Sequence, residues 1–134
     1  IRRRRPFVND IDIVCIPENQ GQLIAVLMEL GHLKVGGQKI IRIATHAKYG
    51  IDLDCYIATP ATWATLKLIR TGSAAHNVKL CSLAKQKGMK LHADGSGLFR
   101  LTDCAGTESR IAGNTEESIF EALGLRYVEP IYRQ

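Results

Sequence analysis

Alternating apolar and polar residues predict three β-strands in the first half of the chain. Residues 10–16 place Asp10 and Asp12 on one face and leave an apolar face opposite. Residues 39–44 and 51–58 have the same apolar character and flank a short polar segment, which predicts a hairpin. We expect the three strands to form one sheet with the carboxylates on a single face.

A helix is predicted between the first two strands. Residues 20–30 carry apolar side chains at helical spacing, with Asn19 as the cap and Gly31 as the stop. Residues 35–38 contain two glycines and are expected to form the turn that precedes the hairpin.

Two further helices are predicted after the hairpin. Pro60 suits the first turn of a helix, and Thr59 is its expected cap. Residues 71–73 interrupt this helix, and the pattern resumes over residues 75–87 before Gly88.

The last third of the chain alternates between short strands and turns and ends in a helix. Asn114 and Glu117 are spaced as a capping box for that helix, and Gly124 is its expected stop. The mixture of elements predicts an α+β fold. The short strands are expected at residues 89–92, 97–102 and 108–111.

Two acidic pairs, Asp10 with Asp12 and Asp52 with Asp54, lie inside predicted strands. The members of each pair project to the same side, although carboxylates are unfavourable in strands unless a cation compensates them. If the two strands pair, three or four carboxylates gather on one patch, which suits Mg²⁺ and its phosphate ligands. The pattern indicates metal-dependent phosphoryl chemistry; the alternative is that these aspartates cap strands or pair with nearby arginines.

Length and charge narrow the class of protein. The chain has 134 residues with 46% hydrophobic content, enough for one domain or two small lobes with a core. A net charge of +5 favours a polyanionic partner. The sequence begins at Ile1 followed by four arginines, so we expect it to be the C-terminal part of a longer protein.

The cysteines and the hydropathy pattern favour a soluble intracellular protein. No apolar stretch reaches membrane-spanning length, and no signal peptide is recognisable. The cysteines have no C-x-x-C spacing and no histidine at ligand spacing, so reduced thiols are favoured over a zinc site or disulfides. They are Cys15, Cys55, Cys81 and Cys104.

Several short motifs follow one another in a particular order along nearly the whole chain. Together they resemble the palm and thumb regions of the family X DNA polymerases, the group that includes DNA polymerase beta. The resemblance implies a nucleotidyltransferase palm at residues 1–72 and a thumb at residues 73–134. The motifs are Arg2-Arg3, Asp10-Ile11-Asp12, Leu53-Asp54, Thr71-Gly72-Ser73, His76-Asn77, Gly88, Leu98-Phe99, residues 115–120, Leu123-Gly124-Leu125, Tyr127, Pro130 and Arg133.

The resemblance implies a site with two divalent ions, Mg²⁺ or Mn²⁺. Asp10 and Asp12 would hold both ions, and Asp54 would hold the catalytic ion and accept the proton of the primer hydroxyl. Two ions stabilise the attacking and the leaving oxygen of a displacement at phosphorus. Asp52 stands where family members often carry a basic residue, and we interpret it as a surface charge rather than an extra ligand.

The resemblance also implies a nucleotide site. Arg3 would contact the triphosphate, since a planar guanidinium fits phosphate oxygens. Thr71, Gly72 and Ser73 would form the turn under the nucleotide sugar, and Asn77 would reach the minor-groove edge of the incoming base. The other arginines of the N-terminal run are interpreted as solvated charges or backbone contacts.

Some positions depart from the family pattern. Arg70 replaces an aromatic residue beside the sugar, Ile69 precedes it, and Cys81 stands where an arginine often touches the template. We expect Arg70 to contact a phosphate or the template. The departures leave open a template-independent nucleotidyltransferase, and a non-catalytic DNA-binding remnant is the third hypothesis.

The resulting prediction is a repair-type, template-directed DNA polymerase. Its partners would be a DNA primer-template and a dNTP, with no membrane association. We expect a monomer in the cytoplasm, in a prokaryotic or phage-like context.

Overall fold

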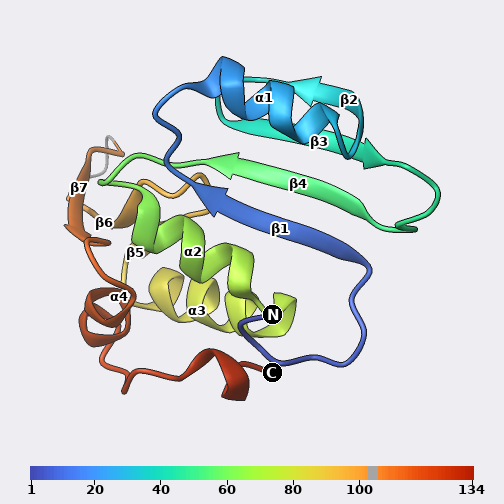
Figure 1. Cartoon of the computed structure of the whole chain (residues 1–134). Helices are drawn as coiled ribbons and strands as arrows, with labels where there is room; N and C mark the ends of the chain where they lie inside the picture. The colour runs from blue at the N-terminus through green and yellow to red at the C-terminus, as the bar shows by residue number, and fades with distance from the viewer. Residues whose placement is uncertain (103–105) are drawn as a thin grey trace. The chain divides into compact units, whose positions relative to one another are not determined.

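The computed structural model of the protein describes residues 1–102 and 106–134. By its internal contacts the chain forms two compact units, residues 5–59 and residues 1–4 together with 60–134 (Figure 1). Each unit contains a β-sheet and helices, which confirms the α+β class. The palm and thumb regions expected at residues 1–72 and 73–134 are functional assignments and stay predictions.

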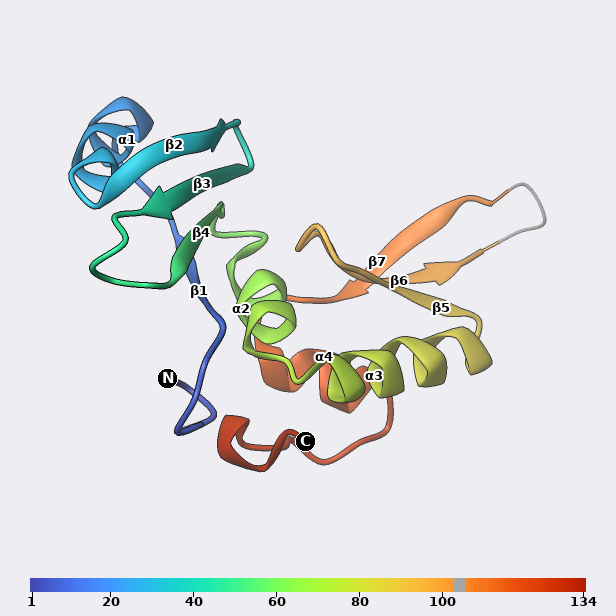
Figure 2. The ribbon, with the colours of Figure 1, turned by 90° about the vertical axis from the view of Figure 1, so that its right-hand side faces the viewer.

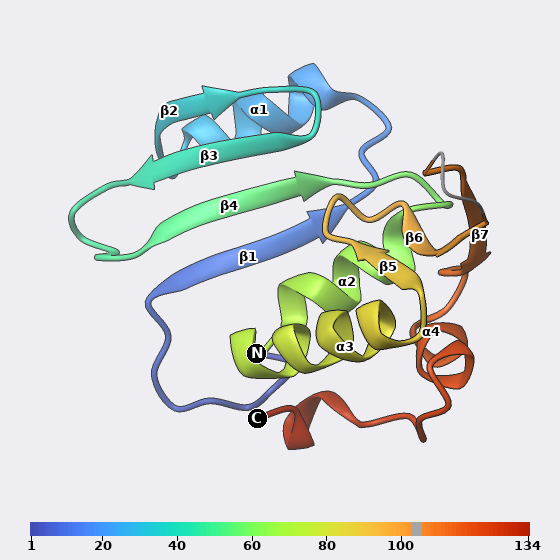
Figure 3. The ribbon, with the colours of Figure 1, turned by 180° about the vertical axis from the view of Figure 1, so that it is seen from behind.

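The unit of residues 5–59 is built on a four-stranded sheet in the order β1-β4-β3-β2 (Figure 3). Strand β1 runs parallel to β4, and the other neighbours are antiparallel. The predicted hairpin is confirmed as β3 and β4, and the predicted first strand is confirmed as β1. The strands are β1 (Asp10–Cys15), β2 (Gly31–Gly36), β3 (Ile40–Thr45) and β4 (Asp52–Ile57).

Helix α1 (Gln20–Met28) supplies the apolar cover for this sheet. Asn19 caps it as predicted, because its Oδ1 accepts a hydrogen bond from the Gln22 backbone N–H at 3.0 Å. Leu27 packs with side chains of the sheet in one apolar cluster. The buried members from the sheet are Ile41, Ile43, Leu53 and Cys55.

The sequence prediction missed strand β2. Gly31 is the first residue of β2 rather than the helix stop, and a Cβ built on it would lie 2.0 Å from the Ala44 carbonyl oxygen. The predicted turn at residues 35–38 begins too early, since β2 continues to Gly36. This strand is exposed along most of its length, so it lacks the apolar alternation by which strands are recognised.

The second unit packs three helices against a three-stranded sheet in the order β5-β6-β7 (Figure 2). Its core joins Leu68 and Leu80 from two helices with Leu98 of the sheet and Phe120 of the last helix, all nearly inaccessible to solvent. The three short strands expected here are confirmed. The elements are α2 (Trp63–Thr71), α3 (Ala74–Gln86), β5 (Met89–His92), β6 (Gly97–Leu101), β7 (Glu108–Ala112), α4 (Glu116–Ala122) and the 3₁₀ helix η1 (Pro130–Tyr132).

Helix α2 begins later than the sequence predicted. Thr62, rather than Thr59, occupies the cap position, and Pro60 lies in a turn before the helix. A proline is as compatible with such a turn as with a helical first turn, so its presence alone does not fix the start.

The start of α4 also differs from the prediction by one residue. Thr115 is the N-cap, and its hydroxyl accepts from the Ser118 N–H at 3.0 Å. The capping box therefore pairs Thr115 with Ser118 instead of Asn114 with Glu117. The side chain of Asn114 instead accepts a hydrogen bond from Arg110 at 2.9 Å.

The structure describes the helices and three of the four cysteines. Among the helices of residues 1–102 and 106–134, none has the length and apolar character to cross a membrane. Cys15, Cys55 and Cys81 are free thiols, and the Sγ atoms of the first two lie 3.2 Å apart. Cys104 lies outside the described residues.

Shortening Ile43 should destabilise the first unit. Ile43 is fully buried between α1 and the sheet, so Ile43→Ala leaves a cavity and should lower the free energy of unfolding by about 2–5 kcal/mol. Urea titration followed by circular dichroism measures the change. Val26→Ala is the control, because Val26 lies on α1 and is 60% exposed. This substitution should change the free energy of unfolding by less than about 0.5 kcal/mol. Equal effects would show that Ile43 is not a core residue.

Candidate active site

The register of β1 with β4 places the two acidic pairs next to each other. Asp10 lies opposite Asp52, and Asp12 lies opposite Asp54. Residues opposite each other in neighbouring strands point to the same face, so four carboxylates share the face of the sheet opposite the apolar cluster with α1. The structure therefore places the three predicted metal ligands, Asp10, Asp12 and Asp54, on one face of the sheet.

Arg42 of β3 holds the carboxylate of Asp54 from the neighbouring strand. Its Nε and Nη2 donate to Oδ1 and Oδ2 of Asp54, each at 2.6 Å. Asp54 is only 14% exposed, and Arg42 is 44% exposed. The hydrogen bonds and the charge of Asp54 raise the pKa of Arg42, which keeps the guanidinium charged. The Tyr56 hydroxyl donates a longer hydrogen bond to Asp54 Oδ2, at 3.4 Å.

Asp52 has a different environment from Asp54. Lys34 Nζ contacts its Oδ2 at 2.7 Å, and both side chains are about half exposed. The hydrogen bond with Lys34 lowers the pKa of Asp52. A single exposed contact of this kind is screened by water and salt.

A pocket of about 750 Å³ lies over this polar face. Its walls carry three of the four carboxylates together with both of the cations that pair with them. A pocket of this size accommodates a nucleotide-sized ligand. It is lined by Asn9, Asp10, Lys34, Arg42, Thr45, Gly50, Ile51, Asp52 and Asp54.

The residues on this face fit divalent ions by their chemistry and by their shared side of the sheet. Carboxylate oxygens are the ligands that Mg²⁺ and Mn²⁺ accept. In residues 1–102 and 106–134, however, no three His, Cys, Asp or Glu side chains converge into a ligand set. Both oxygens of Asp54 accept hydrogen bonds from Arg42.

The predicted nucleotide turn, Thr71-Gly72-Ser73, joins α2 to α3 in the second unit. Thr71 ends α2, and the Ser73 hydroxyl caps α3 by accepting from the His76 N–H at 3.2 Å. Gly72 has φ 66° and ψ −154°, a conformation open essentially to glycine. The peptide bond between Gly72 and Ser73 is cis.

Asn77 and His76 follow this turn on α3. The amide Nδ2 of Asn77 donates to the Ile69 carbonyl of α2 at 2.8 Å, which fixes the side chain beside the turn. Within the described part of the chain its Oδ1 is buried without a hydrogen-bond partner. His76 is buried against Phe120, and this burial lowers the pKa of its imidazole, which favours the neutral form.

The two arginines predicted to bind the nucleotide also belong to the second unit. Arg70 is half-buried in the last turn of α2, where a cation interacts favourably with the helix dipole. Arg3 is partly buried in the segment before β1. Their roles toward a nucleotide stay predictions.

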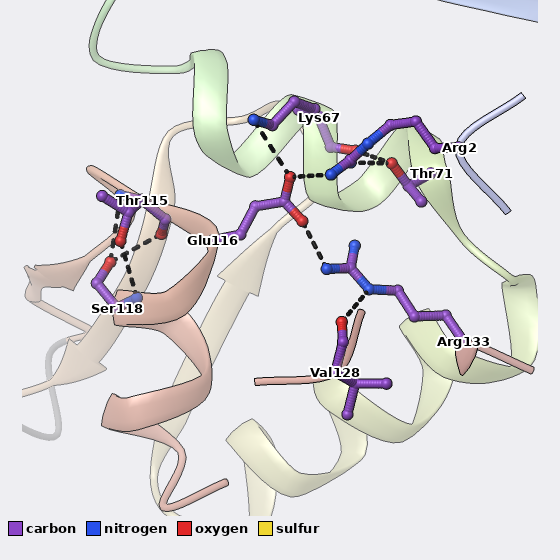
Figure 4. Close-up of polar contacts among 8 residues, drawn as sticks. All are labelled: Arg2, Lys67, Thr71, Thr115, Glu116, Ser118, Val128 and Arg133. Atoms are coloured by element: carbon purple, nitrogen blue, oxygen red, sulfur yellow. Dashed lines mark hydrogen bonds and ion pairs between the residues drawn. The ribbon is translucent and has the colours of Figure 1, made fainter. Parts of the chain in front are cut away.

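Arg2 is bound within the protein, whereas the sequence analysis interpreted it as a solvated charge or a backbone contact. Its Nη1 donates to the Thr71 hydroxyl and, at 3.4 Å, to the Lys67 carbonyl (Figure 4). Its Nη2 pairs with Glu116 Oε1 at 2.9 Å. Arg2 thus connects the segment before β1 to the end of α2 that forms the turn.

Glu116 is the centre of this cluster of charges. It is 3% exposed, and Arg133, which is fully buried, contacts its Oε2 at 2.7 Å (Figure 4). Lys67 lies 3.5 Å from Oε1. The guanidinium of Arg133 also donates to the Val128 carbonyl at 2.9 Å and lies over the Phe120 ring, so the C-terminal segment is held to α4.

A comparison with known protein families gives a match within this second unit. Residues 67–134 match the family model described as DNA polymerase beta thumb. The chain is also similar to the DNA polymerase/3'-5' exonuclease PolX of Bacillus subtilis (strain 168), with 26% identity over 98 residues, or 71% of the chain. The chain spans 17% of that protein's length. The matched thumb segment contains the nucleotide turn, Glu116 and Arg133.

Removing the charge of Glu116 should destabilise the second unit. Glu116→Gln leaves the buried Arg133 without its ionic partner, which typically costs about 3–5 kcal/mol of the free energy of unfolding. Chemical denaturation monitored by circular dichroism tests this. Glu117 is the neighbouring exposed residue on the same helical turn, and Glu117→Gln should have a small effect. A stable Glu116→Gln protein would contradict the role of the cluster.

Proposed function

The chain belongs to the DNA polymerase beta thumb family, and we propose that it works in a family X DNA polymerase, adding a nucleotide from a dNTP to a primer 3′ hydroxyl. The observation that carries this proposal is the register that sets Asp12 beside Asp54 on the polar face of the first sheet. The carboxylate oxygens on this face are suitable ligands for the divalent ions that nucleotidyl transfer uses.

Asp10, Asp12 and Asp54 are the residues that would hold Mg²⁺ or Mn²⁺. Two bound divalent ions would stabilise the attacking and leaving oxygens of an in-line displacement at phosphorus. Asp54 would accept the proton of the primer hydroxyl. It is the more suitable of the two β4 carboxylates because it is largely shielded from water, whereas Asp52 is half exposed.

The turn of the second unit would support the nucleotide. Gly72 presents backbone without a side chain, so a sugar can approach closely. Asn77, fixed by its bond to Ile69, would contact the minor-groove edge of the incoming base. Arg3 would contact the triphosphate, and Arg70 would contact a phosphate or the template.

DNA would be bound chiefly through cations. The net charge of +5 supports contacts with phosphates, which contribute most of the affinity and make it dependent on salt. Template-independent nucleotide addition is the second candidate, because Arg70 and Cys81 depart from the family residues beside the sugar and the template.

Substitution of Asp54 tests this function directly. In the full-length protein, Asp54→Ala should abolish Mg²⁺- or Mn²⁺-dependent nucleotide addition, by at least about 1000-fold, because the hydroxyl loses its proton acceptor and metal ligand. Primer extension measures the rate, and fluorescence anisotropy should show nearly unchanged binding of the primer-template. Asp52→Ala should be far milder. Extension that survives loss of Asp54, or that stops only when Asp52 is lost, would refute the site.

A methyl group at Gly72 should impair nucleotide binding. Gly72→Ala forces an alanine into a backbone conformation, φ 66° and ψ −154°, that is open essentially to glycine, so the turn should distort and the KM for dNTP should rise by about tenfold or more. Steady-state kinetics of the full-length protein measures the effect. Gly88 has the same φ of 66° at the end of α3, so Gly88→Ala imposes similar strain elsewhere. Equal KM changes in both variants would argue for a general effect on folding.

A further inference from the structure

We propose that Arg42 is a positioning residue that sets the orientation of the Asp54 carboxylate for nucleotidyl transfer; this inference rests on the proposed function. In this pair both carboxylate oxygens of Asp54 accept hydrogen bonds from one guanidinium. Arg42 lies on β3, whereas the predicted metal ligands lie on β1 and β4.

The backbone supports this contact. Arg42 and Asp54 lie directly opposite each other on the antiparallel strands β3 and β4. Opposite side chains on one face of such a pair are close neighbours, so the contact needs no loop or helix to bring it about. Ile41 and Ile43, on either side of Arg42, are both fully buried in the apolar cluster, which anchors the strand beneath the guanidinium.

The bidentate geometry restricts rotation of the carboxylate. Two parallel N–H donors at 2.6 Å fix the plane of the Asp54 carboxylate relative to the strand. Each oxygen has two lone pairs, and this side-on contact uses one on each. Tyr56 also donates to Oδ2, at 3.4 Å, so the carboxylate is held by side chains from both β3 and β4.

A lysine could not supply the same restraint. Its ammonium is a compact charge that makes contacts without a fixed plane, whereas the guanidinium fork matches both carboxylate oxygens. The neighbouring pair of Lys34 and Asp52 illustrates the difference in this protein. Lys34 contacts a carboxylate oxygen of Asp52, and both side chains are about half exposed, so water competes for this contact.

Three variants of the full-length protein test the inference: Arg42→Ala, Arg42→Lys and Lys34→Ala. Mn²⁺ binding is measured by electron paramagnetic resonance, and kcat and the KM for dNTP by primer extension. Loss of a side chain that orients a metal ligand typically costs about 10–100-fold in metal affinity or activity. Arg42→Ala should therefore weaken Mn²⁺ binding and lower kcat by about that factor, with the KM for dNTP little changed.

The other two variants separate orientation from charge. Arg42→Lys keeps the charge but loses the fork, so it should recover a minor part of the lost affinity and rate. Lys34→Ala removes the other cation of the face and should change both quantities far less than Arg42→Ala. If circular dichroism shows that Arg42→Ala does not fold, the inference is tested with Arg42→Lys instead. Wild-type Mn²⁺ affinity and kcat in Arg42→Lys would then overturn the inference.

Other outcomes also have a defined meaning. Unchanged or tighter Mn²⁺ binding in Arg42→Ala would contradict the inference, and tighter binding would identify Arg42 as a competing cation. Equal effects of Lys34→Ala and Arg42→Ala would indicate that only net charge matters, which also overturns it. Asp54→Asn in the same assays separates the two proposals. An active Asp54→Asn protein refutes the proposed function, whereas an inactive one beside a normal Arg42→Ala protein refutes the role of Arg42 alone.

Discussion

The parallel pairing of β1 with β4 is the constraint on which the polar face of the first sheet depends. Its register sets Asp10 against Asp52 and Asp12 against Asp54, so four negative charges meet on one side. Such a face is unstable without cations. The neighbouring strands supply two of them, Arg42 for Asp54 and Lys34 for Asp52. The opposite side of the same strands forms an apolar core with α1, so packing and polar chemistry are separated by the alternation of the strand.

Much of the fold follows from local patterns in the sequence. Strong alternation identified β1, β3 and β4, and glycines marked the turns around β5 and β6. The errors fall where local signals are weak or duplicated. Strand β2 is an exposed edge without an apolar face, and the capping box of α4 begins at Thr115, one residue after the Asn114 that the spacing indicated. The side chain of Asn114 is occupied by Arg110, a contact between β7 and the following loop that no helical spacing reveals.

The candidate site was predictable in its carboxylates but not in their partners. Spacing within a strand put Asp10 with Asp12 and Asp52 with Asp54, and the resemblance to the family X DNA polymerases selected Asp54 from the second pair. Arg42 reaches Asp54 through a cross-strand register, and Arg2 reaches Glu116 across more than a hundred residues of sequence. Glu116 lies in the first turn of α4, where an acidic residue is expected because it interacts favourably with the helix dipole. The sequence therefore did not indicate that Glu116 is buried.

The central proposal is that this chain serves template-directed DNA synthesis. The most direct measurement is primer extension by the full-length protein with Mg²⁺ on four templates that differ in the first unpaired base, each supplied with one dNTP at a time. The account predicts that the nucleotide complementary to the template base is added with the highest kcat/KM in all four cases. The same nucleotide preference on every template, or equal addition to a primer without a template, would contradict it.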